Sequence, residues 1–200
     1  MSGLHPGWPA TLTSGSVCLR PIKARDFAAW REVRLRNEAW LARWEPTSAQ
    51  SWTDRHTFSS FMWQRGEMRR AARDGMAMPF VMCVDGKLAG QVNVGPILRG
   101  PLCSGDIGYW IDEKYAGRGL MPQAVAMATL HALGEGRLHR VAAVVRPENA
   151  ASLRVVEKVG FRREGELKNY LDIDGAWRDH VAFAFTVEDD RAALTAIAAG

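Results

Sequence analysis

The length, composition and charge of the chain exclude several classes of protein. Its 200 residues suffice for one globular domain with a sizeable core, and its hydrophobic fraction of 47% is typical of such domains. The formal net charge of +4 is compatible with an acidic partner. The sequence contains no block of five or more like charges, so it gives no indication of direct contact with nucleic acid.

The N-terminus and the cysteines bear on the location of the protein. The first residues lack the basic start and apolar stretch of a secretory signal, and no apolar run is long enough to cross a membrane. We therefore expect a cytoplasmic protein without a membrane partner. Cys18, Cys83 and Cys103 are odd in number and far apart, which predicts reduced thiols and no metal site.

The first third of the chain is predicted to contain an arm, a strand and several helices. Residues 1–15 are rich in Gly, Pro, Ser and Thr and are expected to form an irregular arm. A first strand is expected over 17–22. Helical spacing of apolar residues begins near Phe27 and is interrupted at Asn37. A second segment contains Trp40, Leu41 and Trp44 and ends at 45–47, and a third helix is expected over 54–72.

The rest of the chain alternates predicted strands with predicted helices. Asp85-Gly86 and Asp174-Gly175 each predict a tight hairpin turn. Further helices are expected after Gly119, after Asn149 and over 187–199. The apolar runs predict strands over 79–84, 88–97, 106–111, 141–145, 161–171 and 177–185.

A glycine-containing segment after the strand at 106–111 carries a functional signal. Gly117 and Gly119 leave the backbone free of side chains, and Pro122 suits the first turn of a helix. Such a turn points free amides at one spot, which predicts an anion site, most simply for a phosphate. No Lys-Ser/Thr follows Gly119 and Pro122 replaces a third glycine, so neither the Walker A nor the dinucleotide pattern fits. The alternative is an ordinary turn without a ligand.

A second motif lies at 149–161, with the pattern Asn-x-x-Ser followed by Glu-Lys-x-Gly-Phe. Together the two motifs resemble the cofactor segments of the GCN5-related N-acetyltransferase (GNAT) family, whose loop is Arg/Gln-x-x-Gly-x-Gly/Ala. Ala116 and Met121 depart from that loop pattern, but Gly-x-Gly-Leu-Met is similar to the subgroup that acetylates ribosomal-protein N-termini. The segments 164–180 and 44–46 also resemble the ribosomal-protein-alanine acetyltransferases.

The resemblance implies an α+β GNAT fold in a single domain at 16–200. Its sheet is expected to be mixed, mostly antiparallel and seven-stranded, with a splayed parallel pair and flanking helices. The oligomeric state stays open between monomer and homodimer. The resemblance also implies acetyl-CoA as cosubstrate, bound by Tyr109, Trp110, Ile111, Ala116, Gly117, Arg118, Gly119, Leu120, Met121, Asn149, Ser152 and Lys158.

The implied reaction is direct attack of a protein's N-terminal α-amine on the thioester, with a ribosomal protein among the candidate acceptors. A peptide α-amine has a pKa near 7.7–8.0, so about a tenth of it is neutral at pH 7, whereas a lysine amine near 10.4 needs stronger help. The resemblance implies that the hydroxyl of Ser152 acts as the acid or hydrogen-bonding stabiliser of the departing thiolate. Glu45 is the first candidate for the base or for a ligand of the acceptor's positive N-terminus, and Asp106 and Glu113 are alternatives.

Two other functions remain open at this point. A small-amine acetyltransferase acting on a polyamine or aminoglycoside would favour acidic clusters in the early helices, but residues 27–73 carry many arginines instead. A non-catalytic coenzyme A-binding sensor stays open because Ala116 lacks the polar side chain of the loop pattern. Either alternative would keep the same fold and cofactor site.

Overall fold

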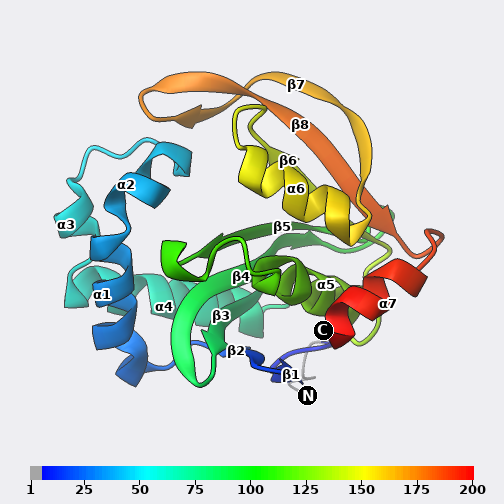
Figure 1. Cartoon of the computed structure of the whole chain (residues 1–200), viewed down its shortest axis with the longest axis horizontal. Helices are drawn as coiled ribbons and strands as arrows, with labels where there is room; N and C mark the ends of the chain where they lie inside the picture. The colour runs from blue at the N-terminus through cyan, green and yellow to red at the C-terminus, as the bar shows by residue number, and fades with distance from the viewer. Residues whose placement is uncertain (1–5) are drawn as a thin grey trace.

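A computed structural model describes residues 6–200, in which eight strands form one sheet (Figure 1). The spatial order is β1-β2-β3-β4-β5-β6-β8-β7. β5 and β6 pair in parallel, and the other neighbouring pairs are antiparallel. The strands are β1 (Leu12–Ser14), β2 (Val17–Pro21), β3 (Met78–Val84), β4 (Lys87–Leu98), β5 (Ser104–Ile111), β6 (Arg140–Val145), β7 (Arg162–Ile173) and β8 (Ala176–Thr186).

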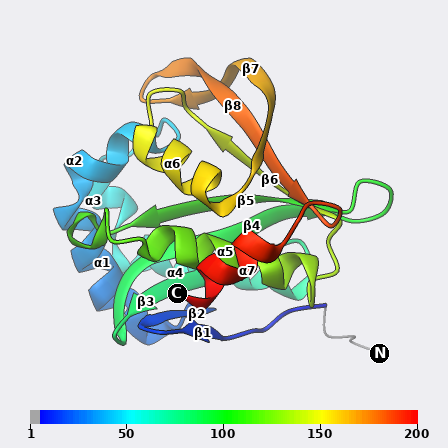
Figure 2. The same ribbon diagram turned by 45° about the vertical axis from the view of Figure 1, so that its right-hand side comes forward.

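Helices cover both faces of the sheet (Figure 2). The helices before β3 lie on one face: α1 (Phe27–Arg36), α2 (Glu38–Leu41), α3 (Trp52–Arg55) and α4 (Phe58–Arg73). The later helices lie on the other: α5 (Leu120–Leu133), α6 (Ala150–Val159) and α7 (Ala192–Ala199). Short 3-10 helices occur at η1 (Ala24–Asp26), η2 (Ala42–Trp44) and η3 (Glu113–Tyr115).

The sheet therefore separates two hydrophobic cores, and β3 contributes to both. Phe80 and Met82 pack into the core around α5, whereas Val81 and Cys83 pack with Trp30 of α1 on the opposite face. Successive side chains of a strand point to opposite faces, so a strand covered on both sides must be apolar throughout. This explains why every residue of β3 is buried.

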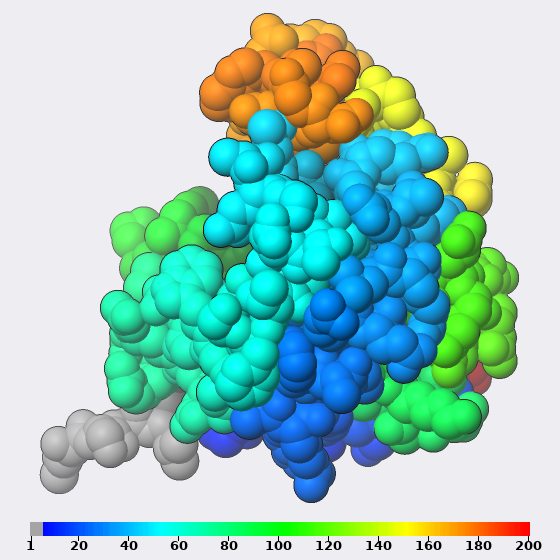
Figure 3. All heavy atoms as spheres, turned by 90° about the vertical axis from the view of Figure 1, so that its left-hand side faces the viewer, coloured from blue at the N-terminus to red at the C-terminus, as the bar shows by residue number. Residues whose placement is uncertain are grey.

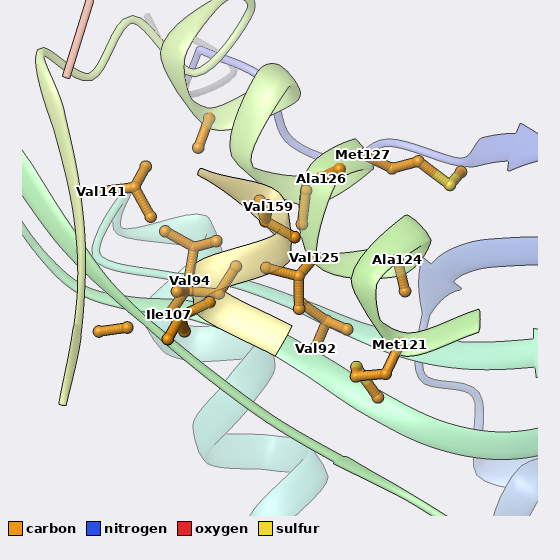
Figure 4. Close-up of a cluster of buried hydrophobic side chains, with 14 of the residues drawn as sticks. Val92, Val94, Ile107, Met121, Ala124, Val125, Ala126, Met127, Val141 and Val159 are labelled. Atoms are coloured by element: carbon orange, nitrogen blue, oxygen red, sulfur yellow. The ribbon is translucent and has the colours of Figure 1, made fainter. Parts of the chain in front are cut away.

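α5 is the most deeply buried helix element of the larger core. Val125 lies against Val92, Val94 and Ile107 of the sheet, and Met121 is a buried residue of the first turn of the helix (Figure 4). Because α5 also packs against α6 and α7, apolar residues surround it rather than forming one stripe. The start of α5 is thus held rigidly beside the end of β5.

The parallel pair diverges part of the way along its length (Figures 1 and 2). Its register is Ser104↔Arg140, Gly105↔Val141 and Asp106↔Ala142, and it ends there although β5 runs on to Ile111 and β6 to Val145. Beyond Asp106, β5 stays paired with β4, and β6 stays paired with β8. The sheet thus opens between two halves, which confirms the expected splayed pair.

Two sequence expectations are corrected by the structure. The arm predicted over 1–15 is not irregular throughout, because Leu12–Ser14 form β1 against β2 through a turn at Gly15, and the sheet has eight strands rather than seven. Residues 1–5 lie outside the described part of the chain. The helix predicted over 54–72 is two helices, because Thr57 caps α4: its hydroxyl accepts from the amide of Ser60.

Within residues 6–200, no helix is both long and apolar enough to span a bilayer. The same residues contain no group of three or more His, Cys, Asp or Glu side chains placed to hold a metal ion.

Candidate active site

A cavity of about 530 Å³ lies beside the diverging end of β5. It is bounded by the α2–η2 segment, the glycine loop with the start of α5, and the start of α6. Its lining residues are Trp40, Leu41, Arg43, Trp44, Glu45, Tyr109, Trp110, Ile111, Tyr115, Ala116, Gly117, Gly119, Leu120, Met121, Pro122, Glu148, Asn149, Ala150, Ala151, Ser152, Arg154, Val155 and Lys158.

The structure thus brings both sequence motifs and Glu45 to one place. Of the predicted cofactor-binding residues, Arg118 is the exception: it is exposed, does not line the cavity, and its guanidinium lies 5.6 Å from the ring centre of Tyr115. Trp40 and Trp44 form a further wall of the cavity. For the five tryptophans between Trp30 and Trp63 the sequence left two interpretations open, plain helix packing and the wall of a substrate cleft.

The glycine loop has the geometry of an anion site. Gly117 and Gly119 have φ of +75° and +78°, and Gly119 is the N-cap of α5. A Cβ at either position would meet nothing within 4 Å, so the loop presents open backbone. The first amides of α5 have no intrahelical partner and carry the positive end of the helix dipole. A phosphate group fits this loop.

The edges left by the diverging strands suit an extended amide-containing chain. Beyond Asp106, the backbone of β5 has no pairing partner on the side of β6. Tyr109 and Ile111 of this segment line the cavity. An added chain can pair with such an edge as a further strand would. The glycine loop, the unpaired edge of β5 and the cavity together fit the pyrophosphate and the pantetheine arm of coenzyme A.

The start of α6 and β5 are joined by a pair of hydroxyls. Asn149 caps α6, because its Oδ1 accepts from the amide of Ser152 at 3.0 Å. This cap holds Ser152 so that its Oγ lies 2.8 Å from the Oη of Tyr109, whose single proton has two acceptors within reach, that Oγ and the carbonyl oxygen of Ser152 at 3.2 Å. Burial raises the pKa of Tyr109, so the phenol stays protonated.

Glu45 lines the cavity from the segment after η2 and is fixed by two arginines. Pro46 favours an extended conformation for the preceding residue, so η2 ends at Glu45 with φ −97° and ψ 152°. Its Oε1 accepts from the guanidinium of Arg34, and its Oε2 accepts from Nη2 of Arg55 at 2.6 Å. Both carboxylate oxygens therefore already receive charge-assisted hydrogen bonds.

Arg34 is a buried cation on the inner face of α1. Its guanidinium lies 4.6 Å from the ring centre of Trp52 and 5.0 Å from that of Trp110. Its Nε donates to Nε2 of His56 at 2.9 Å, so Nε2 is the acceptor and Nδ1 carries the proton toward the carbonyl of Trp52. Burial lowers the pKa of His56 to about 4, which keeps its ring neutral.

Sequence reasoning missed Arg34, Arg55 and His56. Arg34 stands one residue after Val33 on the apolar face of α1, and a charged residue there is a detectable signal of a buried pair. The other two base candidates lie elsewhere. Asp106 and Glu113 do not line the cavity, although burial raises the pKa of Asp106 despite the opposing charge of Arg140.

The β7–β8 hairpin contacts the two residues that follow Glu45. The backbone of Pro46 bridges to Ile173, and the amide of Thr47 donates to the carbonyl of Asp172 at 3.0 Å. The hydroxyl of Thr47 accepts from the amide of Gly175 at 2.8 Å. Figure 3 shows the hairpin, in orange, resting on the segment that follows Glu45.

Comparisons with known proteins agree with this geometry. The model of the acetyltransferase (GNAT) domain matches residues 16–162. The structure of Mycobacterium smegmatis RimJ in complex with CoA-disulfide has a TM-score of 0.93 and 41% sequence identity, covering 96% of this chain and 95% of that chain.

Curated relatives carry the same activity class in their names. The [ribosomal protein uS5]-alanine N-acetyltransferase of Escherichia coli is 33% identical over 184 residues, covering 89% of this chain and 91% of the relative. "Probable N-acetyltransferase YjcK" of Bacillus subtilis is 41% identical over 106 residues, and the match spans 59% of its length. The chain belongs to the GNAT acetyltransferase family and is an N-acetyltransferase that uses acetyl-CoA.

Proposed function

We propose that the protein acetylates the N-terminal α-amine of a protein, with a ribosomal protein as the leading acceptor. The observation that carries the proposal is that Glu45, bonded to Arg34 and Arg55, lines the same cavity as Ser152. The name of the relative from Escherichia coli, a [ribosomal protein uS5]-alanine N-acetyltransferase, supports a ribosomal acceptor. The proposal carries with it a cytoplasmic location, where ribosomal proteins are made.

The charge of the Glu45 cluster favours an α-amine over a lysine or a polyamine. Arg34 and Arg55 contribute two positive charges, Glu45 one negative charge, and His56 none, so the cluster carries +1. A positive environment lowers the pKa of a bound amine and favours its neutral, nucleophilic form. This small help suffices for an α-amine, whereas a lysine amine near pKa 10.4 is only about 0.04% neutral at pH 7.

The proposed roles follow from the same geometry. The glycine loop 117–119 and the start of α5 bind the pyrophosphate, and Asn149 and the edge of β5 bind the pantetheine arm. Acetyl-CoA supplies an activated thioester. Glu45 accepts a hydrogen bond from the acceptor amine and orients it, while water takes the proton that the amine loses, because the carboxylate is already bonded to two guanidiniums.

Ser152 is proposed to stabilise the departing thiolate by donating a hydrogen bond to its sulfur, while the thiolate takes its proton from water. A thiol of pKa about 8.5 is a good leaving group, so a hydroxyl donor is sufficient. When Tyr109 donates its proton to Oγ of Ser152, the serine's own proton is left free to point at the sulfur. The tyrosine thus acts as a positioning residue through the serine.

The test measures coenzyme A release from acetyl-CoA with peptides beginning Ala or Ser, the same peptides N-blocked with an internal lysine, spermidine and an aminoglycoside. We expect turnover of the free Ala or Ser peptides only, and a large loss in Ser152→Ala. Turnover of spermidine or the aminoglycoside alone would overturn the proposal and leave the family intact. Binding of acetyl-CoA without turnover of any acceptor would favour a sensor.

A further inference from the structure

A second cavity lies beside Glu45, a lining residue of the first cavity. Its volume is about 530 Å³, and it lies between the segment after Glu45, α3 and α4. Its lining is polar except for one aromatic side chain, Trp63, which is 69% exposed. The lining residues are Ser48, Gln50, Arg55, Ser59, Ser60, Trp63 and Gln64.

Arg55 joins the two cavities. It lines the second cavity, and its Nη2 donates at 2.6 Å to Oε2 of Glu45, which lines the first. An acceptor whose amine lies at Glu45 therefore has its next residues within reach of Arg55. An extended chain advances about 3.3–3.6 Å per residue, so the side chains at positions 2 to 4 span this neighbourhood.

The second cavity carries an excess of positive charge. Arg55 is the charged residue of its lining, and its partner Glu45 is shared with the buried Arg34, so one carboxylate faces two guanidiniums. The nearest acidic neighbour in sequence, Asp54, does not line the cavity and accepts a hydrogen bond from Ser51 at 2.6 Å. Arg55 retains N–H donors for a further carboxylate.

We propose that the second cavity binds the acceptor chain just after its N-terminus and selects acceptors with a carboxylate side chain at positions 2 to 4. This inference rests on the proposed function. The carboxylate pairs with Arg55, and the hydroxyls and amides of Ser59, Ser60 and Gln64 hydrogen-bond to the acceptor's main chain. Trp63 covers an apolar face of the bound segment.

The experiment uses peptides that begin with Ala and carry Glu, Gln or Lys at one of positions 2 to 6. For the wild-type enzyme we expect kcat/KM about fivefold higher for Glu than for Gln at one of positions 2 to 4, and lower again for Lys. At position 6 the three peptides should be equal. The preference should shrink as salt rises, because the pair is partly exposed.

Two variants connect the preference to the cavity. Gln64→Glu is nearly isosteric and places a carboxylate beside Arg55, so the Glu-over-Gln ratio should fall to one or below. Arg69→Gln is the matched control, because it removes a positive charge from an exposed position of α4 outside the cavity lining. Its Glu-over-Gln ratio should equal that of the wild type.

The outcomes separate this inference from the proposed function. Equal rates for Glu and Gln at positions 2 to 4, or an unchanged preference in Gln64→Glu, overturn the inference while α-amine acetylation stands. Failure of every peptide alongside turnover of a small amine overturns both.

Discussion

Removing the hydroxyl of Tyr109 tests whether this residue acts through Ser152. In Tyr109→Phe, Oγ of Ser152 loses its partner at 2.8 Å, and its own proton can turn away from the thiolate. A neutral hydrogen bond is worth about 1 kcal/mol net, which corresponds to roughly a fivefold loss in kcat. The KM for acetyl-CoA should stay nearly constant, because the ring that lines the cavity is retained.

The double variant shows whether the two hydroxyls form one unit. Ser152→Ala removes the hydroxyl that donates a hydrogen bond to the thiolate and should lower kcat by about a hundredfold. Once the serine hydroxyl is absent, the tyrosine hydroxyl has nothing to orient, so Ser152→Ala/Tyr109→Phe should be no slower than Ser152→Ala.

The assay is initial-rate release of coenzyme A with a saturating Ala-starting peptide, with unfolding in urea measured in parallel. Tyr170→Phe is the control, because that tyrosine is 39% exposed on β7 and does not line the cavity. If Tyr109→Phe still slowed the reaction fivefold in the Ser152→Ala background, the reasoning would be refuted, since the tyrosine would then act independently of the serine.

Three further predictions concern the loop and the buried cluster. Gly119→Ala forces a positive φ on a residue with a Cβ, so it should cost about 1–2 kcal/mol of stability and raise the KM for acetyl-CoA. Gly86→Ala is the control: Gly86 has φ +75° and equally open space, so the substitution should cost the same stability without changing that KM. Arg34→Met leaves His56 without its donor and Glu45 with one guanidinium, that of Arg55, so urea unfolding should show a loss of about 1–3 kcal/mol; an unchanged stability would contradict a buried, paired arginine. The pKa of His56 falls from 6.5 to about 4 on folding, so between these values the unfolded chain binds more protons than the folded one. The free energy of unfolding should therefore fall by roughly 3 kcal/mol as the pH drops from 6.5 to 4. His56→Gln should flatten the slope of unfolding free energy against pH in that window.

Local patterns predicted the elements near the cofactor site well. Gly117, Gly119 and Pro122 indicated a turn opening a helix, and Asn149 indicated a cap; each depends on backbone conformation within a few residues. The two Asp-Gly hairpins follow the same rule, with Asp85 and Asp174 at positive φ. Where the signal was weak, as in the three residues of β1, pairing with β2 decided the conformation instead.

The Glu45 cluster could not be predicted in the same way, because its residues come together only in the folded chain. Arg34, His56 and Arg55 are defined as a cluster by packing between α1, α3 and the Glu45 segment, and no spacing in the sequence encodes that contact. Likewise, the sequence shows two strands at 106–111 and 141–145, but not that their pairing stops at Asp106.

The sequence by itself determined the family motifs, the glycine turn and the capped helix, because these are short-range consequences of glycine, proline and side-chain capping. Only the tertiary structure decided that Ser152 meets Tyr109, and that Glu45 is held by two arginines rather than left free as a base. The physical reason is that charge and proton affinity at a site depend on neighbours from distant segments, and those neighbours are fixed by packing of the whole chain.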